Sequence, residues 1–387
     1  MRTSTTIVSI AALSLALAAC SGDNGTAGAD SLSGEGTGED CTIEAPIPIG
    51  AALSLTGGAA SYGESQRNGL QLAVDHLNSG DGVAYDLTVE DDQTDPRQGI
   101  TAFESLVADD HSIIIGPTLS NGAFQAQPIA QEAGVPVLAI SNTTEGITEQ
   151  GEYIFRNSLT EAQVIPQTVT TAVEAYDLEE VVVMYSDDDA FTEGGYAEFD
   201  AALDEQGVEV SNTLTFSVAD TDFRALLTEA RNADPDAIVV SGLIEAAIPL
   251  VTQARELGID VPIIGGNGFN NPQLMADAGQ AAEGVVVGAA WNSASDTPEN
   301  IDFLEAYEAE FGHLPDQFAA QAYAAMTMID VAVRENCSGE RDDIRAGLNT
   351  VTDLSTVLGQ VSIDDNRDTE HEAVVQLVDG GMFTVLD

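Results

Sequence analysis

The sequence predicts an α/β fold in which parallel strands alternate with helices. From residue 47 onward, short apolar runs alternate with amphipathic stretches of helical length, the pattern of successive strand–helix units. Runs such as residues 135–140 (VPVLAI) are apolar throughout, as expected for a buried strand. The region from residue 41 to residue 387 is too long for one ordinary core, so we expect two lobes.

The predicted elements follow one another along this whole region. Strands are predicted at residues 47–55, 86–90, 112–115, 135–140, 181–185, 208–216, 237–241, 261–265, 284–291, 360–363 and 373–377. Helices are predicted at residues 65–77, 98–109, 122–131, 196–205, 223–232, 246–256, 301–311, 317–334 and 341–348. No break rich in Pro and Gly divides the middle of the chain, so we do not expect two lobes joined by a single linker.

The N-terminus has the order of a secretory signal. Met1 and Arg2 give a positive start, residues 7–19 form an apolar run, and small residues precede Cys20. This pattern resembles the lipobox of bacterial lipoproteins, which implies a signal peptide at residues 1–19 and lipid attachment at Cys20. The alternatives are an ordinary signal peptide that happens to end in cysteine and a short transmembrane anchor, but the run is well below the ~20 residues that span a bilayer. We expect an extracytoplasmic protein, lipid-anchored to the outer face of the cell membrane.

Residues 20–42 are predicted to be a flexible tether. The segment consists mainly of Gly, Ser, Thr and acidic residues, so it is too polar to bury a core. Chains of this composition behave as flexible coil.

Three cysteines fit an exported protein. If Cys20 is lipidated, Cys41 and Cys337 remain, and an even pair in an oxidising compartment predicts a structural disulfide. The alternative is two unrelated thiols.

The charge of the chain is strongly acidic. Eleven basic residues, all of them Arg, stand against 65 acidic residues, for a formal net charge of −54. Repulsion makes nucleic acid and anionic lipid poor partners. We interpret the charge as adaptation to salt, which screens self-repulsion. The alternative is a calcium-loaded surface, but in residues 91–96 (DDQTDP) Pro96 stands where an EF-hand needs glycine, so no metal site is predicted.

Short motifs occur in a fixed order along the folded region. They are IG at 49–50, LTG at 55–57, YG at 62–63, NG at 68–69, AVDHLN at 73–78, EDD at 90–92, DP at 95–96, IGP at 115–117, GVP at 134–136 and PDAI at 235–238. Together they resemble the leucine/isoleucine/valine-type periplasmic binding proteins of ABC transporters, over residues 45–386. The resemblance implies the type I fold of that family: two doubly wound parallel-sheet lobes joined by three hinge crossings. It places lobe 1 at residues 43–157 and 291–358, and lobe 2 at residues 158–290 and 359–387.

The first lobe offers hydroxyl groups where a ligand is expected. In parallel α/β sheets, ligands bind beyond the carboxyl ends of the strands, where helix N-termini favour anions. Ser120 follows one predicted strand, and Ser141, Asn142 and Thr143 follow the next. In the family, the matching serine and the threonine of the second loop bind an α-carboxylate, which implies that role for Ser120, Ser141 and Thr143. The alternative is helix capping alone.

The second lobe departs from the family at its ligand-binding positions. The family usually carries tyrosine where this chain has Phe191, and the leucine-binding members carry an acid that holds the ammonium group near Asn267. An amide accepts a hydrogen bond but brings no charge, and a buried unpaired ammonium is costly. Glu245 or Asp189 could supply the missing charge.

Aromatic side chains are the candidates for the apolar end of the site. Tyr62 and Trp291 could form its wall, and each could instead be a packing aromatic.

The resemblance implies capture of a small amphipathic solute and its delivery to an ABC importer. A branched-chain or related amino acid is the first expectation for the ligand, with amides, urea and small carboxylates as alternatives. A ligand-sensing receptor module of the same fold is the other alternative. The four histidines form no HExxH motif, and the chain lacks GxSxG and Walker motifs. We therefore expect no enzyme and no cofactor, and a monomer whose partners are ABC permease and ATPase subunits.

Overall fold

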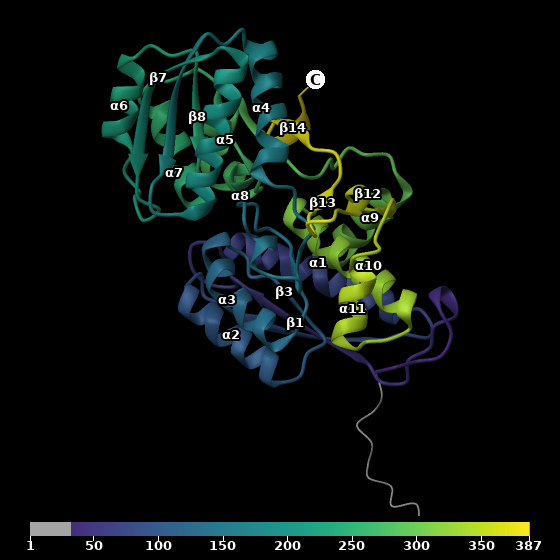
Figure 1. Cartoon of the computed structure of the whole chain (residues 1–387). Coiled ribbons are helices and arrows are strands. Elements are labelled where there is room, and N and C mark those ends of the chain that lie inside the picture. Colours follow the sequence, from purple (N-terminus) through teal and green to yellow (C-terminus); the bar gives the residue numbers. More distant parts are fainter. Residues whose placement is uncertain (1–31, 387) are drawn as a thin grey trace, which may run out of the picture.

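The computed structural model describes residues 32–386, which form two lobes (Figure 1). The first lobe is built on a five-stranded parallel sheet in the order β2 (Tyr85–Asp91), β1 (Ile47–Leu53), β3 (Ile113–Ile115), β4 (Val137–Ala139) and β5 (Ile154–Arg156). Its helices are α1 (Ala60–Asn78), α2 (Pro96–Ala108), α3 (Ser120–Ala133), α9 (Pro298–Phe311), α10 (Gln317–Asn336) and α11 (Arg341–Leu348). Short 3-10 helices are η1 (Gly38–Asp40) and η2 (Thr148–Gln150).

The second lobe is built on a seven-stranded sheet. Its strand order is β15 (Met382–Val385), β14 (Val374–Asp379), β10 (Val285–Ala289), β9 (Ile263–Gly265), β8 (Ala237–Ser241), β6 (Glu180–Ser186) and β7 (Glu209–Phe216). The strands from β10 to β7 are parallel, whereas β14 and β15 add an antiparallel pair at one edge. The helices are α4 (Glu161–Tyr176), α5 (Ala190–Gln206), α6 (Arg224–Asn232), α7 (Ile244–Glu256), α8 (Gln273–Ala278), η3 (Asn267–Phe269) and η4 (Gly279–Ala282).

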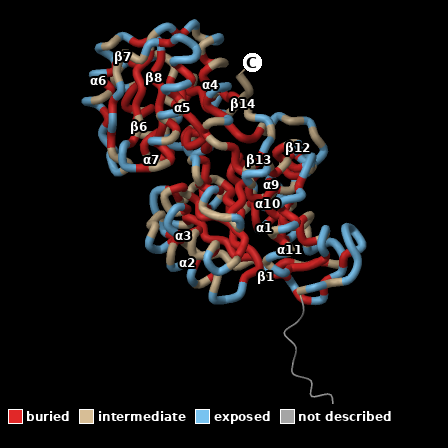
Figure 2. Tube along the Cα trace, in the orientation of Figure 1, coloured by how far each residue is buried: buried red, intermediate tan, exposed pale blue. Residues whose placement is uncertain are grey.

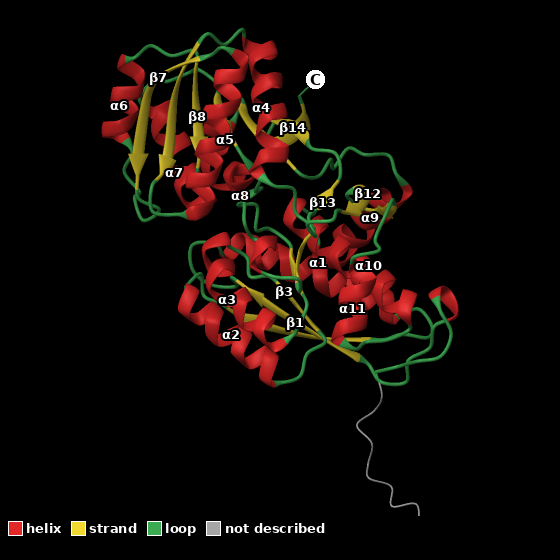
Figure 3. Cartoon of the chain, in the orientation of Figure 1, coloured by secondary structure: helices red, strands yellow, loops and turns green. Residues whose placement is uncertain are grey.

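Each central sheet is covered by helices on both faces (Figure 3), and the buried residues gather in the sheets (Figure 2). Successive strand residues point to opposite faces, so apolar runs feed two cores. In β3, Ile113 and Ile115 join the core under α1 and α10, whereas Ile114 joins the core under α2 and α3. In β6, Val181 and Val183 likewise pack into one core of the second lobe, whereas Val182 packs into the core on the other face of the sheet. The continuous apolar runs of the sequence are explained by this burial on both faces.

The chain crosses between the lobes three times. The crossings follow β5, β10 and the last strand of a small sheet formed by β11 (Leu354–Thr356), β12 (Gly359–Ile363) and β13 (Thr369–Glu370). The predicted type I architecture of two doubly wound lobes is confirmed. Among the helices of residues 32–386, none is long and apolar enough to cross a bilayer.

The predicted end of lobe 1 at residue 358 is corrected by the packing of the small sheet. Val361 and Ile363 of β12 are buried in the core of the first lobe, although residues 359–387 were expected in the second. Val361 and Ile363 are two positions apart, so both side chains lie on the same face of β12, and that face packs on the first lobe. The chain crosses to the second lobe after β13. The sequence analysis missed two elements that the structure contains, helix α4 and strand β5.

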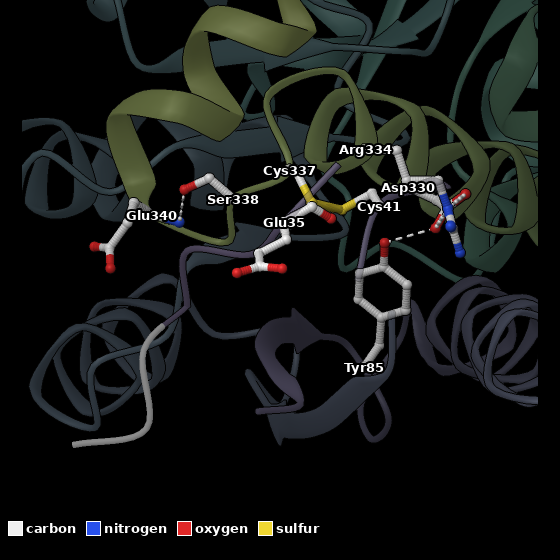
Figure 4. The surroundings of a disulfide bond; sticks show 8 residues. All are labelled: Glu35, Cys41, Tyr85, Asp330, Arg334, Cys337, Ser338 and Glu340. Carbon is white, nitrogen blue, oxygen red and sulfur yellow. Dashed lines mark hydrogen bonds and ion pairs between the residues drawn. A yellow bond between two sulfur atoms is a disulfide. The ribbon is translucent and has the colours of Figure 1, made fainter. Parts of the chain in front are cut away.

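The predicted tether at residues 20–42 is also corrected, because its last part is packed on the first lobe. Leu32 lies against the core of that lobe and its carbonyl accepts from Gly339 N at 2.8 Å, while Gly34 N donates to Cys337 O at 2.8 Å. The predicted disulfide between Cys41 and Cys337 is confirmed, with a Cα–Cα distance of 5.3 Å (Figure 4). We call residues 32–41 the strap. The signal peptide, Cys20 and the rest of the tether lie outside the described residues.

Candidate functional site

A cavity lies between the two lobes, at the carboxyl ends of the parallel strands. The empty space between its lining side chains is about 470 Å³, part of it open to solvent. A cleft where two doubly wound lobes meet is the usual ligand position for such folds. The lining residues are Tyr62, Thr118, Leu119, Ser120, Ser141, Thr143, Gln317, Phe318 and Gln321 from the first lobe, and Asp189, Phe191, Leu243, Asn267 and Gly268 from the second.

The polar wall of the first lobe contains buried groups without a partner. Ser120 Oγ, Thr143 Oγ1 and Gln321 Oε1 are buried and make no hydrogen bond of full geometry to any part of residues 32–386. Ser120 is the first residue of α3, but the N-cap of that helix is Leu119 and no side chain caps it. Helix capping therefore does not explain Ser120. These three side chains also line the cavity, so they are available to bind a ligand placed there.

Two other predicted residues of this wall are already hydrogen-bonded. Ser141 Oγ donates to Thr118 O at 2.6 Å and accepts from Gln66 Nε2 at 2.7 Å. Asn142 does not line the cavity; its amide donates to Pro117 O at 2.9 Å and holds two loops together. The prediction that placed Asn142 at the ligand is therefore not supported, because its side chain points into the protein.

Arg156 fixes the loop that carries Thr143. Its side chain is buried, and its Nη1 donates to Asn142 O at 2.9 Å and Thr144 O at 2.7 Å. The charge is paired with Asp368 at 2.7 Å. A guanidinium donates five N–H groups and can bridge several acceptors, so this one side chain connects the loop to the turn that precedes β13.

The apolar lining of the cavity is formed by aromatic and aliphatic side chains. Tyr62 and Phe318 pack with ring centroids 4.6 Å apart, and Phe191 and Leu243 face them from the second lobe. Trp291 lies outside this cavity. Its Nε1 donates to Asn300 at 2.9 Å and its ring packs on Phe303, so it is a packing aromatic.

Direct hydrogen bonds hold the lobes together in a closed arrangement. The hydroxyl of Tyr62, on α1, donates to Gly268 O at 2.6 Å and accepts from Ile244 N at 2.7 Å, both in the second lobe. Nearby, Asn121 Nδ2 donates to Asp189 Oδ2 at 2.5 Å. Burial raises the pKa of Tyr62 well above its usual value, so the phenol stays neutral and acts as both donor and acceptor.

The two candidate carboxylates lie in different places. Asp189 lines the ligand cavity and caps α5 by accepting from Thr192 N at 3.1 Å; burial raises its pKa. Glu245 does not line that cavity. It lies in an adjoining space between the lobes, together with Asp92 and Asp188, so its predicted contact with the ligand is not supported.

Asn267 lines the cavity from the second lobe and is hydrogen-bonded to a carboxyl that the sequence analysis missed. Asn267 Nδ2 donates to Glu161 Oε1 at 2.9 Å. Burial raises the pKa of Glu161 to about 7, opposed by the Asn267 amide and by the hydroxyl of Thr143, which is near although it makes no bond of full geometry.

The missed residues share one signal, a helix N-cap beside the cavity. Thr160 caps α4 in a capping box with Gln163, which places Glu161 at the first helical position. Asp316 caps α10, and the first turns of that helix carry Gln317, Phe318 and Gln321 to the ligand. The pattern Ser/Thr-x-x-Glu/Gln at 160–163 is readable in the sequence and would have predicted α4.

The acidic residues at the end of β2 and just after it are used for hydrogen bonds within the protein. Asp91 accepts from Thr56 Oγ1 at 2.7 Å and Asp92 from Ser54 Oγ at 2.6 Å, while Asp95 caps α2. Within the described part of the chain, no three His, Cys, Asp or Glu side chains are placed to hold a metal ion.

The sequence matches a family model and curated proteins of the same kind. The family model for "periplasmic binding protein" matches residues 46–381. The leucine-, isoleucine-, valine-, threonine-, and alanine-binding protein of Pseudomonas aeruginosa is 26% identical over 329 residues, which cover 84% of this chain and 87% of the relative.

Solved structures of proteins with similar names have the same fold as this chain. The leucine binding protein LivK from Thermotoga maritima is 25% identical with a TM-score of 0.83, covering 88% of this chain and 97% of the other. The branched-chain amino acid transporter substrate binding protein LivJ from Streptococcus pneumoniae, in complex with isoleucine, is 28% identical with a TM-score of 0.82, covering 88% and 98%.

Proposed function

This chain belongs to the periplasmic binding protein family, and we propose that it captures a small amphipathic solute between its lobes and delivers it to an ABC importer. The ligand we propose is a branched-chain or related amino acid. The observation that carries this proposal is the pair of buried hydroxyls, Ser120 Oγ and Thr143 Oγ1, in a cavity that is also lined by apolar side chains.

The cavity offers both polar and apolar contacts, which suits a ligand with a carboxylate and an aliphatic side chain. A carboxylate beside Ser120 would accept hydrogen bonds from the hydroxyls and from backbone N–H groups at the N-terminus of α3, where the helix dipole favours an anion. An aliphatic side chain would be buried against Tyr62, Phe191 and Phe318. The relatives named above bind branched-chain amino acids, which supports this choice.

A neutral amide-type ligand is the second candidate, and Asn267 is the reason. The wall where leucine-binding relatives are expected to carry an acid presents an amide in this chain, which matches a ligand without a full positive charge.

A thermal-shift screen of the purified protein, in high salt, tests the proposal. A ligand present at 100 times its Kd adds about 2.7 kcal/mol to the free energy of unfolding. We expect leucine, isoleucine or valine to raise the melting temperature, and D-leucine to serve as the matched control. A shift with amides or urea and with no amino acid would replace the ligand class. No shift with amino acids, amides, urea or small carboxylates would overturn the binding function.

We also propose that the protein is exported, lipid-anchored through Cys20 and monomeric, and that it works with a permease and two ATPase subunits without covalent chemistry. Mass spectrometry of the mature N-terminus should find a diacylglyceryl group on Cys20. A Cys20→Ala variant should not be lipidated, and an unmodified Cys20 in the wild type would overturn the anchor.

A further inference from the structure

Among the described residues that line the ligand cavity, Asp189 is the one whose side chain carries a charge. The other lining groups are apolar side chains, hydroxyls, amides and one phenol, and the phenol of Tyr62 is neutral because burial raises its pKa. Asp189 reaches the cavity from the second lobe, where it immediately precedes α5. With Asp189 ionised, the lining of the cavity is therefore negatively charged.

Asp189 is buried and has no cationic partner within the protein. The residue is 4% exposed, and none of the ion pairs within residues 32–386 includes it. Burial raises the pKa of Asp189, and the neighbouring charged groups Asp188 and Glu193 raise it further because they are also acids. A buried carboxylate without a counter-charge is costly, so a cationic group beside Asp189 is favoured.

Hydrogen bonds hold this carboxyl group in place without using its whole capacity as an acceptor. Oδ1 accepts from Thr192 N at 3.1 Å, which caps α5, and Oδ2 accepts from Asn121 Nδ2 at 2.5 Å. The backbone N–H of Phe191 is a further donor near it, and all three donors stabilise the ionised form. A carboxylate can accept about four hydrogen bonds, so a position remains for a ligand.

Asn121 brings Asp189 close to the hydroxyl that we propose as a carboxylate partner. Asn121 directly follows Ser120 at the start of α3, and its Oδ1 also accepts from Ala190 N at 3.0 Å, so both ends of its amide bond to the second lobe. In an α-amino acid the ammonium and the carboxylate are attached to the same carbon. The group that binds the ammonium must therefore lie near Ser120, as Asp189 does in the closed arrangement.

We propose that Asp189 binds the ammonium group of the ligand and so restricts the ligand class to zwitterionic α-amino acids. This inference rests on the proposed function and selects among its ligands. A simple carboxylate bound at Ser120 would bring a second negative charge near Asp189, in a cavity lined mainly by buried side chains, where like charges repel strongly. A neutral amide would leave the carboxylate of Asp189 without a counter-charge. A zwitterion places its carboxylate at the hydroxyls of Ser120 and Thr143 and its ammonium at Asp189.

The alternative is that Asp189 only closes the lobes through Asn121, and a comparison of two ligands separates these roles. L-leucine and (S)-2-hydroxy-4-methylpentanoate share a carbon skeleton and a carboxylate, but the second carries a hydroxyl in place of the ammonium. We expect the wild type to bind leucine about 30-fold or more tightly than the hydroxy acid in titration calorimetry. Asp189→Asn should lose this preference. Asparagine caps helices as well as aspartate does, so the variant is expected to fold.

Asn121→Ala is the matched control, because it removes the bonds between the lobes and leaves the carboxylate of Asp189 in place. It should weaken the binding of both ligands by the same factor and so keep the wild-type preference. If Asp189→Asn weakens both ligands equally, Asp189 acts in closure alone and the proposal is overturned. A wild type that binds the hydroxy acid as tightly as leucine would also overturn it.

The two readouts distinguish this inference from the proposed function. Binding of leucine by the wild type tests the function, whereas the preference between the two ligands tests the role of Asp189. If the thermal-shift screen selects another amino acid, that amino acid and its 2-hydroxy analogue take the place of this pair. A melting curve confirms that each variant is folded, and Asp189→Ser, which also keeps a capping side chain, repeats the test if Asp189→Asn is not.

Discussion

Replacing Tyr62 by phenylalanine tests the closed arrangement of the lobes. The substitution keeps the ring that packs on Phe318 and removes the hydroxyl that donates to Gly268 O at 2.6 Å and accepts from Ile244 N at 2.7 Å. Both lost bonds join the two lobes. An open form, with the two lobes apart, would lack both bonds, so their loss is expected to raise the free energy of the closed form alone.

The expected size of the effect comes from the number of bonds. A typical hydrogen bond contributes about 1 kcal/mol net, so losing two destabilises the closed form by about 2 kcal/mol. A factor of ten in affinity corresponds to about 1.4 kcal/mol, and ligand binding is coupled to closure. The Kd of Tyr62→Phe should therefore rise about 30-fold.

Titration calorimetry measures the Kd, and stopped-flow fluorescence should assign most of the loss to faster dissociation. Tyr323→Phe is the matched control, since that hydroxyl contacts His76 within the first lobe, at 2.8 Å. An unchanged Kd in Tyr62→Phe, or an equal loss in Tyr323→Phe, would refute the assignment of Tyr62 as the bridge between lobes.

Three further predictions concern the first lobe. Ser120→Ala and Thr143→Ala should each raise the Kd about tenfold without lowering the melting temperature. Ser112→Ala is the control, because it removes another buried unpartnered hydroxyl that does not line the cavity, and it should leave the Kd unchanged. Normal binding by both Ser120→Ala and Thr143→Ala would contradict the ligand contact. Arg156→Met should lower the free energy of unfolding by about 3 kcal/mol in urea titrations, because a buried ion pair and two loop contacts are lost; a change below 1 kcal/mol would count against that role. Cys337→Ala should cost about 2–5 kcal/mol and expose the strap to proteolysis, and a strap that resists protease after reduction would show that the disulfide is not what holds it.

The α/β architecture was predictable because strand burial leaves a direct mark on the sequence. Continuous apolar runs at 113–115 and 181–184 correspond to β3 and β6, whose residues feed cores on both faces of each sheet. The positions that face the cavity follow from strand ends, so Ser120 and Thr143 could be placed beside each other from chain order alone.

The remaining features depend on contacts between distant segments. Glu161 is an acid at the start of a helix, where acids are usually exposed, and it is buried in the structure with Asn267 and Gly266 packed against it. The strap is polar, and its order comes from Leu32, the disulfide and backbone pairing with the end of α10. Composition carries no information about such partners, so both features were missed.

The strap also fixes where a membrane anchor would pull on the protein. Helix α10 begins at the ligand cavity with Gln317 and ends beside the disulfide, and its 20 residues make it about 30 Å long. If Cys20 carries the lipid, the 12 residue steps from Cys20 to Leu32 span at most about 43 Å. The strap then holds the attached segment on the side of the first lobe that faces away from the second lobe (Figure 1). Traction from the bilayer would act on that lobe alone, leaving the second lobe free to swing open and shut.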